Sequence, residues 1–206
     1  MKRVAKHKMN AEEMFSWYYQ NIDIRNRTIY FGAHQPSEEL IDEEKIYSVN
    51  DWSAQNIIKG LYVLEHINND PINIIWFSYG GDWDAGMAIY DVMKLSKCKL
   101  TMTCYGRVRS MGTVILQAAD TRIISKSCLF MIHYGTFGLP EMHSKDAEAN
   151  AKYNEVISDT MEDIYLAKIR KKKKSYTKKK LKDLMTYDCY LSPKEAVDLG
   201  LADKVL

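Results

Sequence analysis

The architecture of this chain follows from one run of residues, Asn73-Ile74-Ile75-Trp76-Phe77-Ser78-Tyr79-Gly80-Gly81. Its apolar part is continuous, which is the pattern of a strand buried on both faces of a parallel sheet. The paired glycines then predict a tight turn, because glycine adopts the positive φ angles that such turns need. A helix is expected next, since Ala85, Ile89 and Met93 recur on one helical face. The run therefore predicts a strand–turn–helix unit.

The same order of elements continues on both sides of this unit. Further strands are expected at residues 28–32, 99–104, 121–124 and 128–132, and further helices after Asn50 and from Ser110 to Leu116. A turn is expected to begin at Gly106, between the strand at 99–104 and the helix at Ser110. Repeated units of this kind predict a parallel sheet with right-handed crossovers, so the expected fold class is α/β.

The flanking segments differ from this pattern. Residues 33–49 are polar and acidic and predict a surface loop, whereas residues 141–169 carry an apolar stripe at helical spacing. Ser192 followed by Pro193 predicts a capped helix start. The basic run at 170–180 has two interpretations, a patch for nucleic acid or an acidic partner, and a solvated loop after the long helix. The near-neutral charge of the whole chain favours the loop.

The composition is that of a soluble globular protein with one domain. The chain has 206 residues, of which 46% are hydrophobic and 27% charged, and its formal net charge is +2. This near-balance gives no reason to expect nucleic acid or a membrane as a partner. The cysteines show no metal-ligand spacing and are expected to be reduced, and no secretory signal or membrane span is recognisable. We therefore expect a cytoplasmic protein without a metal or cofactor.

Side chains with catalytic potential stand where the expected strands end. Ser110 opens a helix, and His133 directly follows the apolar strand at 128–132. Taken alone, such a serine is more often a helix cap, and such a histidine is more often a hydrogen-bonded structural residue. Together they supply a nucleophile and a base, and the turn at Gly80 and Gly81 adds backbone N–H groups at the end of a neighbouring strand. The combination favours nucleophilic catalysis.

Four motifs occur in an order and with spacings that resemble the proteolytic subunit of Clp protease. They are Gly80-Gly81 followed by Ala85-Gly86-Met87, then Gly106-X-X-X-Ser110-Met111-Gly112, then Met131-Ile132-His133, and then Asp188-X-Tyr190-Leu191-Ser192-Pro193-Lys194-Glu195-Ala196. The resemblance covers roughly residues 24–206. The separation of Gly81 from Ser110 agrees with the family without a gap.

The resemblance implies a fold and an assembly. The fold would be the α/β spiral of βαβ units that Clp proteases share with crotonases. It would form a single domain at residues 28–206, with a handle helix in the region of about 137–176 and an N-terminal axial or flexible segment at 1–27. The assembly would be a homo-oligomeric heptameric ring, stacked in pairs as a tetradecamer. The implied partners are an AAA+ Clp ATPase that unfolds substrates and the polypeptides it delivers.

The resemblance also implies a catalytic centre. By position, Ser110 matches the nucleophile, His133 the general base and Asp188 the residue that orients the base, which is expected to be a buried carboxylate. The backbone amides of Gly81 and Met111 match the oxyanion hole. The implied reaction is hydrolysis of peptide bonds through an acyl-enzyme, inside the ring, by a serine endopeptidase.

Among the departures from the family pattern, one concerns the site and another the assembly. Arg109 stands directly before the expected nucleophile, where the family has a small residue, and it either favours acidic peptide segments or points into solvent. The second interpretation is favoured, because long cationic side chains tend to reach water. Cys189 replaces an arginine that many family members use between rings, which weakens the expectation of stacked rings.

Other functions remain open at this point. The chain could be a catalytically silent ring subunit that scaffolds active partners, although it keeps all the triad residues. It could be a viral maturation-type protease that trims capsid or scaffold proteins without an ATPase. A crotonase-type acyl-CoA enzyme would also use paired backbone amides, but its chemistry needs no Ser-His-Asp set.

Overall fold

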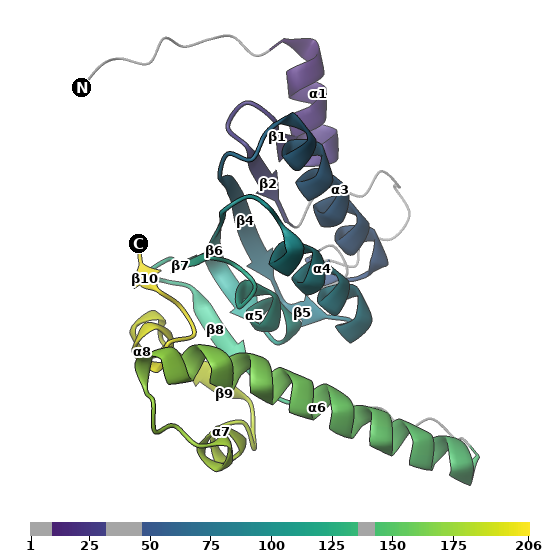
Figure 1. Cartoon of the computed structure of the whole chain (residues 1–206), viewed down its shortest axis with the longest axis vertical. Coiled ribbons are helices and arrows are strands. Elements are labelled where there is room, and N and C mark those ends of the chain that lie inside the picture. The colour runs from purple at the N-terminus through teal and green to yellow at the C-terminus, as the bar shows by residue number, and fades with distance from the viewer. Residues whose placement is uncertain (1–9, 32–46, 136–142) are drawn as a thin grey trace.

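The computed structural model describes residues 10–31, 47–135 and 143–206, which form a mixed sheet flanked by helices (Figure 1). The main sheet has the order β1 (Ile22–Asp23), β2 (Thr28–Tyr30), β4 (Ile72–Ser78), β6 (Leu100–Arg109), β7 (Thr121–Ile124) and β10 (Lys204–Val205). A branch leaves it at β6, where β8 (Leu129–Ile132) pairs with β6 and β9 (Cys189–Leu191) pairs with β8. The pairs β2–β4, β4–β6, β6–β7 and β6–β8 are all parallel, which confirms the expected α/β class.

Strand β4 occupies the centre of the sheet, as its apolar sequence predicts. Ile72, Ile74 and Trp76 are fully buried, but the alternate residues Asn73 and Phe77 are exposed and half-buried. Burial on both faces was therefore a wrong expectation. On the second face of the sheet, the side chains of Tyr47 and Arg107 contact the ring of Phe77 and leave it half-buried.

Three helices pack successively against the sheet and bring their N-termini near the ends of the strands. They are α3 (Asp51–Ile67), α4 (Trp83–Leu95) and α5 (Met111–Leu116). Asn50 and Asp82 cap the first two, each accepting a hydrogen bond from the backbone N–H three residues later. The short strand β5 (Gly80–Gly81) precedes α4 and pairs with β3 (Ser48–Val49), so the glycine pair is part of a small second sheet.

Strand β6 is longer than its sequence suggested. The turn expected at Gly106 does not form, because Gly106 adopts a φ of +60° and the strand bends there without ending. Residues 101–104 pair with β7, whereas residues 107–109 pair with β8. A Cβ atom at Gly106 would lie 2.6 Å from the ring of Phe77, so glycine also gives the ring its space. The bend carries the chain directly to Ser110.

A long helix, α6 (Ser144–Lys172), confirms the helix expected at 141–169 over its described residues. Its first half extends away from the sheet and is largely exposed, whereas Ile157, Met161 and Tyr165 are buried against the body (Figure 1). The basic run does not form one loop, because its first residues belong to α6 and its last to α7 (Lys178–Leu184). Helix α8 (Pro193–Leu199) begins after the Ser192 cap, as expected.

The described N-terminal residues extend the sheet beyond the expected domain start at residue 28. Helix α1 (Ala11–Gln20) leads into β1, which pairs antiparallel with β2. The loop expected at 33–49 lies mostly outside the described residues, as does the start of the handle region. None of the described helices combines the length and apolar character needed to cross a membrane.

Candidate active site

Ser110 stands at the junction of β6 and α5, in a backbone conformation that is rare for a residue with a side chain. Its φ of 49° lies in the left-handed region, and such strained residues are concentrated at functional sites. The surrounding backbone holds it there. Its N–H donates to the carbonyl of Met131 at 2.9 Å, and its carbonyl accepts from Thr113 Oγ1 at 2.6 Å. The hydroxyl is therefore presented at a sharp strand-to-helix turn.

Two glycines give this turn its space. A Cβ atom at Gly80, whose φ is +100°, would lie 2.5 Å from the Cβ of Ser110. A Cβ atom at Gly86 would collide with the side chain of Met111, the first residue of α5. Glycine at position 80 therefore leaves room for Ser110, and glycine at position 86 leaves room for the observed side chain of Met111.

His133 and Asp188 complete a hydrogen-bonded chain from Ser110. His133 Nε2 lies 2.8 Å from Ser110 Oγ, and His133 Nδ1 lies 2.9 Å from Asp188 Oδ1. The second contact follows from strand pairing, because β8 and β9 run antiparallel with Ile132 opposite Cys189. The residue after Ile132 therefore lies beside the residue before Cys189. The structure thus brings together the three side chains that the sequence nominated.

The three hydrogen-bonded side chains differ in their exposure to solvent. The side chain of His133 is 18% exposed, but that of Asp188 is 54% exposed. The expectation of a buried carboxylate at Asp188 was therefore wrong. Asp188 stands on the connection between α7 and the short strand β9, which pairs with β8 alone among the described strands.

The two expected oxyanion-hole residues, Gly81 and Met111, line the same pocket as Ser110 and His133. The Met111 amide occupies the first position of α5, where a backbone N–H has no acceptor within the helix. Gly81 has a φ of +142°, and a side chain there would collide with the Val49 backbone in β3. Their role in binding an oxyanion stays a prediction.

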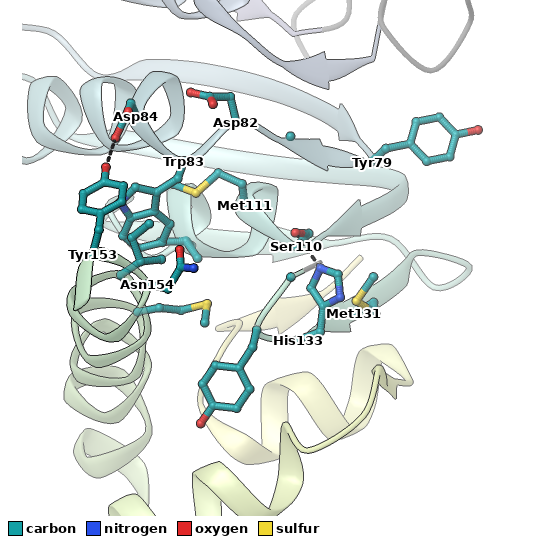
Figure 2. A pocket seen from close by; sticks show the side chains of 16 residues that line it. Tyr79, Asp82, Trp83, Asp84, Ser110, Met111, Met131, His133, Tyr153 and Asn154 are labelled. Carbon is teal, nitrogen blue, oxygen red and sulfur yellow. Dashed lines mark hydrogen bonds between the residues drawn. The ribbon is translucent and has the colours of Figure 1, made fainter. Parts of the chain in front are cut away.

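The pocket has a volume of about 530 Å³ and lies between the sheet and α6 (Figure 2). Its apolar wall combines Met111 and Val114 of α5 with Ile157 and Met161 of α6. The sequence analysis did not assign these α6 residues to the site. The sequence did contain a signal for these pocket residues, because Ile157 and Met161 are four residues apart on the apolar stripe that predicted the helix.

The rim of the pocket also carries polar contacts from α4 and α6. Tyr153 donates a hydrogen bond to Asp84 Oδ1 at 2.7 Å, which joins α6 to the first turn of α4 (Figure 2). Tyr134, next to His133, donates to Glu162 Oε1 at 2.6 Å. Burial and the bond to Glu162 raise the pKa of Tyr134, and the bond to Asp84 raises the pKa of Tyr153. Both phenols therefore remain donors at neutral pH.

The residues around the pocket suit acyl transfer better than metal chemistry. A hydroxyl in contact with an imidazole, itself in contact with a carboxylate, is the arrangement that activates a serine nucleophile. Within the described ranges, no group of three or more His, Cys, Asp or Glu side chains could hold a metal ion.

Comparisons with known proteins agree on one family. A family model described as Clp protease matches residues 33–206. The ATP-dependent Clp protease proteolytic subunit of Deinococcus radiodurans is 34% identical over 161 residues, which cover 77% of this chain and 76% of that protein. Proteolytic subunit 2 of the ATP-dependent Clp protease of Prochlorococcus marinus (strain NATL2A) is 30% identical over 165 residues, covering 77% of this chain and 78% of that protein.

A solved structure has the same fold. A ClpP1 point variant from Listeria monocytogenes superposes with a TM-score of 0.72 and 25% sequence identity. The match covers 89% of this chain and 92% of that chain.

Proposed function

The chain belongs to the Clp protease family and is a serine-type endopeptidase of that family, and we propose that Ser110, His133 and Asp188 are its catalytic triad. The observation that carries the proposal is the unbroken chain of contacts of 2.8 and 2.9 Å from the hydroxyl through both imidazole nitrogens to the carboxylate. Each contact has the length of a good hydrogen bond.

The proposed triad implies an order of proton transfers. His133 Nε2 accepts the Ser110 proton while Ser110 Oγ attacks the peptide carbonyl, and Asp188 holds the proton on Nδ1 and stabilises the imidazolium. His133 then returns a proton to the leaving amine, which leaves an acyl-enzyme on Ser110. Water attacks this ester with His133 again acting as the base.

We assign the oxyanion hole to the backbone N–H groups of Gly81 and Met111. Both residues line the pocket beside Ser110, and the Met111 amide has no partner within its helix. The N-terminus of α5 also favours negative charge where the tetrahedral intermediate develops it.

The substrate of this reaction would be unfolded polypeptide processed inside a ring. Helix α6 supports a ring, because its projecting half exposes Tyr153 and Val156, whose side chains are 48% and 61% accessible. Exposed apolar side chains on a projecting helix are suited to contact with a neighbouring subunit. A heptamer, its stacking as a tetradecamer, an AAA+ Clp ATPase as partner and a cytoplasmic location remain parts of this proposal that rest on the family.

Labelling with a fluorophosphonate tests the catalytic centre directly. The wild-type protein should react at one residue and should cleave an internally quenched peptide with an apolar residue at its centre. Ser110→Ala should lose both reactions and keep its circular dichroism spectrum. Ser175→Ala, which changes an exposed serine between α6 and α7, should retain both.

The alternatives give different results. A silent ring subunit would show neither labelling nor cleavage in the wild type. Labelling that persists in Ser110→Ala would mean that another residue is the nucleophile and would overturn the assignment.

A further inference from the structure

A cluster of arginine and aromatic side chains lies beside the proposed active site and takes no part in the triad. The guanidinium of Arg107 lies 4.0 Å from the ring centre of Tyr79 and 4.7 Å from that of Phe77. Arg109 lies 5.8 Å from the ring centre of Tyr79 and 6.0 Å from that of Tyr190. These distances are within the range of cation–π attraction. Neither arginine simply extends into water, which was the favoured expectation for Arg109.

Strand register connects this cluster with the pocket at Ser110. Arg109 of β6 lies opposite Met131 of β8, and Met131 lies opposite Tyr190 of β9. Met131 also lines the pocket together with Ser110 and His133, so the cluster borders the proposed site. Arg109 is also bonded directly to Ser110 in the chain. The guanidinium groups therefore belong to the surface that a peptide at Ser110 would meet.

The two guanidinium groups have unused capacity for an anion. Among the described residues, neither Arg107 nor Arg109 has a carboxylate within ion-pair distance. Arg109 Nε is buried without a hydrogen-bond partner in the described part of the chain. Stacking on a ring occupies the face of a guanidinium and leaves the N–H groups on its edge free to bind a carboxylate. The described residues therefore hold the two guanidinium groups in place without pairing either of them with a carboxylate.

The charges around Ser110 are distributed unevenly. Tyr79, whose ring lies within cation–π range of both arginines, lies on the other side of Ser110 from Tyr153 and Asn154 of α6 (Figure 2). The rim toward α4 and α6 instead carries the carboxylates of Asp82 and Asp84. An acidic side chain would be repelled at the α6 end of the site and attracted at the Tyr79 end.

We propose that Arg107 and Arg109, held by Tyr79, form a subsite that binds an acidic side chain of the peptide substrate, on the side of Ser110 away from α6. The proposal rests on the proposed peptidase function and adds a substrate preference to it. The carboxylate would pair with the free edges of the guanidinium groups, while the apolar pocket against α6 takes a side chain from the other side of the cleaved bond. The two subsites together would fix the direction in which the peptide backbone runs past Ser110.

Peptide cleavage measures this preference. A set of internally quenched peptides keeps one apolar residue at the cleavage position and carries Asp, Asn or Lys at each flanking position in turn. For the wild type, kcat/KM should be about tenfold higher for Asp than for Asn at one or more positions on a single side of the cleaved bond, as expected for a charge-assisted contact. The difference should appear mainly in KM, because the contact forms on binding.

Variants then attribute the preference to the arginines. Arg109→Gln and Arg107→Gln should reduce the ratio of Asp to Asn rates toward one, and Arg109→Lys should restore part of it. Arg170→Gln, which removes an exposed arginine near the end of α6, should keep the full ratio. The wild-type ratio should also fall when sodium chloride is raised from about 50 mM to 500 mM, because salt screens exposed charges.

The outcomes separate this proposal from the function on which it rests. Normal labelling and cleavage with equal rates for Asp and Asn would refute the subsite and leave the peptidase assignment intact. Loss of labelling and cleavage in the wild type would overturn both. If Arg109→Gln changes the sedimentation of the protein but not the ratio, the cluster is a contact between copies of the chain, and the subsite is refuted.

Discussion

Asp188 makes a single recorded contact within the described residues, with His133 Nδ1, and more than half of its side chain is accessible to water. Its place is determined by the pairing of β9 with β8 rather than by a pocket around the carboxylate. Water can therefore solvate the carboxylate and partly replace it, which a buried orienting aspartate would not permit.

Asp188→Asn should lower kcat by more than about 10²-fold but by less than the roughly 10⁴-fold loss known for the buried aspartate of chymotrypsin-type proteases. The amide keeps the shape but can favour the wrong tautomer of His133. Steady-state kinetics on a short peptide would measure the loss. Asp183→Asn is the control, because Asp183 is exposed in α7 and, among the described residues, pairs with Lys179 on the surface. A large loss for Asp183→Asn with a mild one for Asp188→Asn would contradict the assignment.

At the scale of elements, a buried hydrogen bond joins the short helix α5 to α6. Thr113 Oγ1 donates to the Ser110 carbonyl, and Tyr165 of α6 lies 2.6 Å from the same hydroxyl. Since Thr113 gives its proton to Ser110, the phenol of Tyr165 donates to Thr113. Burial raises the pKa of Tyr165, so the phenol keeps this proton. The helix that projects from the body is thereby linked to the backbone of the proposed nucleophile.

Removing this link should weaken the fold more than the chemistry. Tyr165→Phe should lower the free energy of unfolding by about 1 kcal/mol, because one buried hydrogen bond is lost while Thr113 keeps its bond to Ser110. Urea unfolding would measure it. Tyr62→Phe, at an exposed tyrosine of α3, should leave the unfolding midpoint unchanged. Equal midpoints for wild type and Tyr165→Phe would show that the contact contributes nothing to stability.

At the scale of the molecule, Arg122 ties the C-terminus to the sheet. It donates to Gln117 Oε1, to the carbonyl of Gly200 and to the carboxylate of Asp203. These partners belong to segments that follow α5 and α8. Burial would raise the pKa of Asp203, but hydrogen bonds from the side chain and backbone of Arg122 outweigh it and lower the pKa below 3.8.

This shift predicts a pH-dependent contribution to stability. A carboxylate with a lowered pKa in the folded state stabilises the fold above its ordinary pKa, and the contribution disappears as the pH falls through the folded value. Asp203→Asn should therefore be less stable than wild type at pH 7, and the gap should narrow below about pH 4. Thermal unfolding between pH 7 and 2 would measure the gap. A constant gap would contradict the ionic origin of the effect, and Asp183→Asn serves as the surface control.

The assembly prediction depends on the exposed half of α6. If the wild type forms a ring, the Val156→Asp variant should sediment more as single chains than the wild type does. The reason is that the variant would bury a charge at the subunit contact. Val156→Thr, which keeps the size and adds no charge, should preserve the ring. A wild type that sediments only as a single chain at micromolar concentration would refute the ring.

The sequence by itself determined the order of strands and helices, the α/β class and the identity of Ser110, His133 and Asp188 as candidates. The elements and the class follow from local signals, namely the apolar run of β4, the glycine pair after it and the Ser192 cap, whereas Asp188 was named only through the resemblance of the motifs to a known family. Such signals are readable along the chain because hydrophobic periodicity and turn chemistry involve neighbouring residues.

Only the tertiary structure decided where these elements meet. Gly106 was expected to begin a turn, yet it bends β6 onto β8 because the Phe77 ring and a second partner strand lie beside it. The exposure of Asp188 and the approach of Arg109 to the Tyr79 ring likewise depend on residues far apart in the chain. Burial, partner choice and side-chain direction are set by non-local packing, whose geometry is absent from any local pattern of residues.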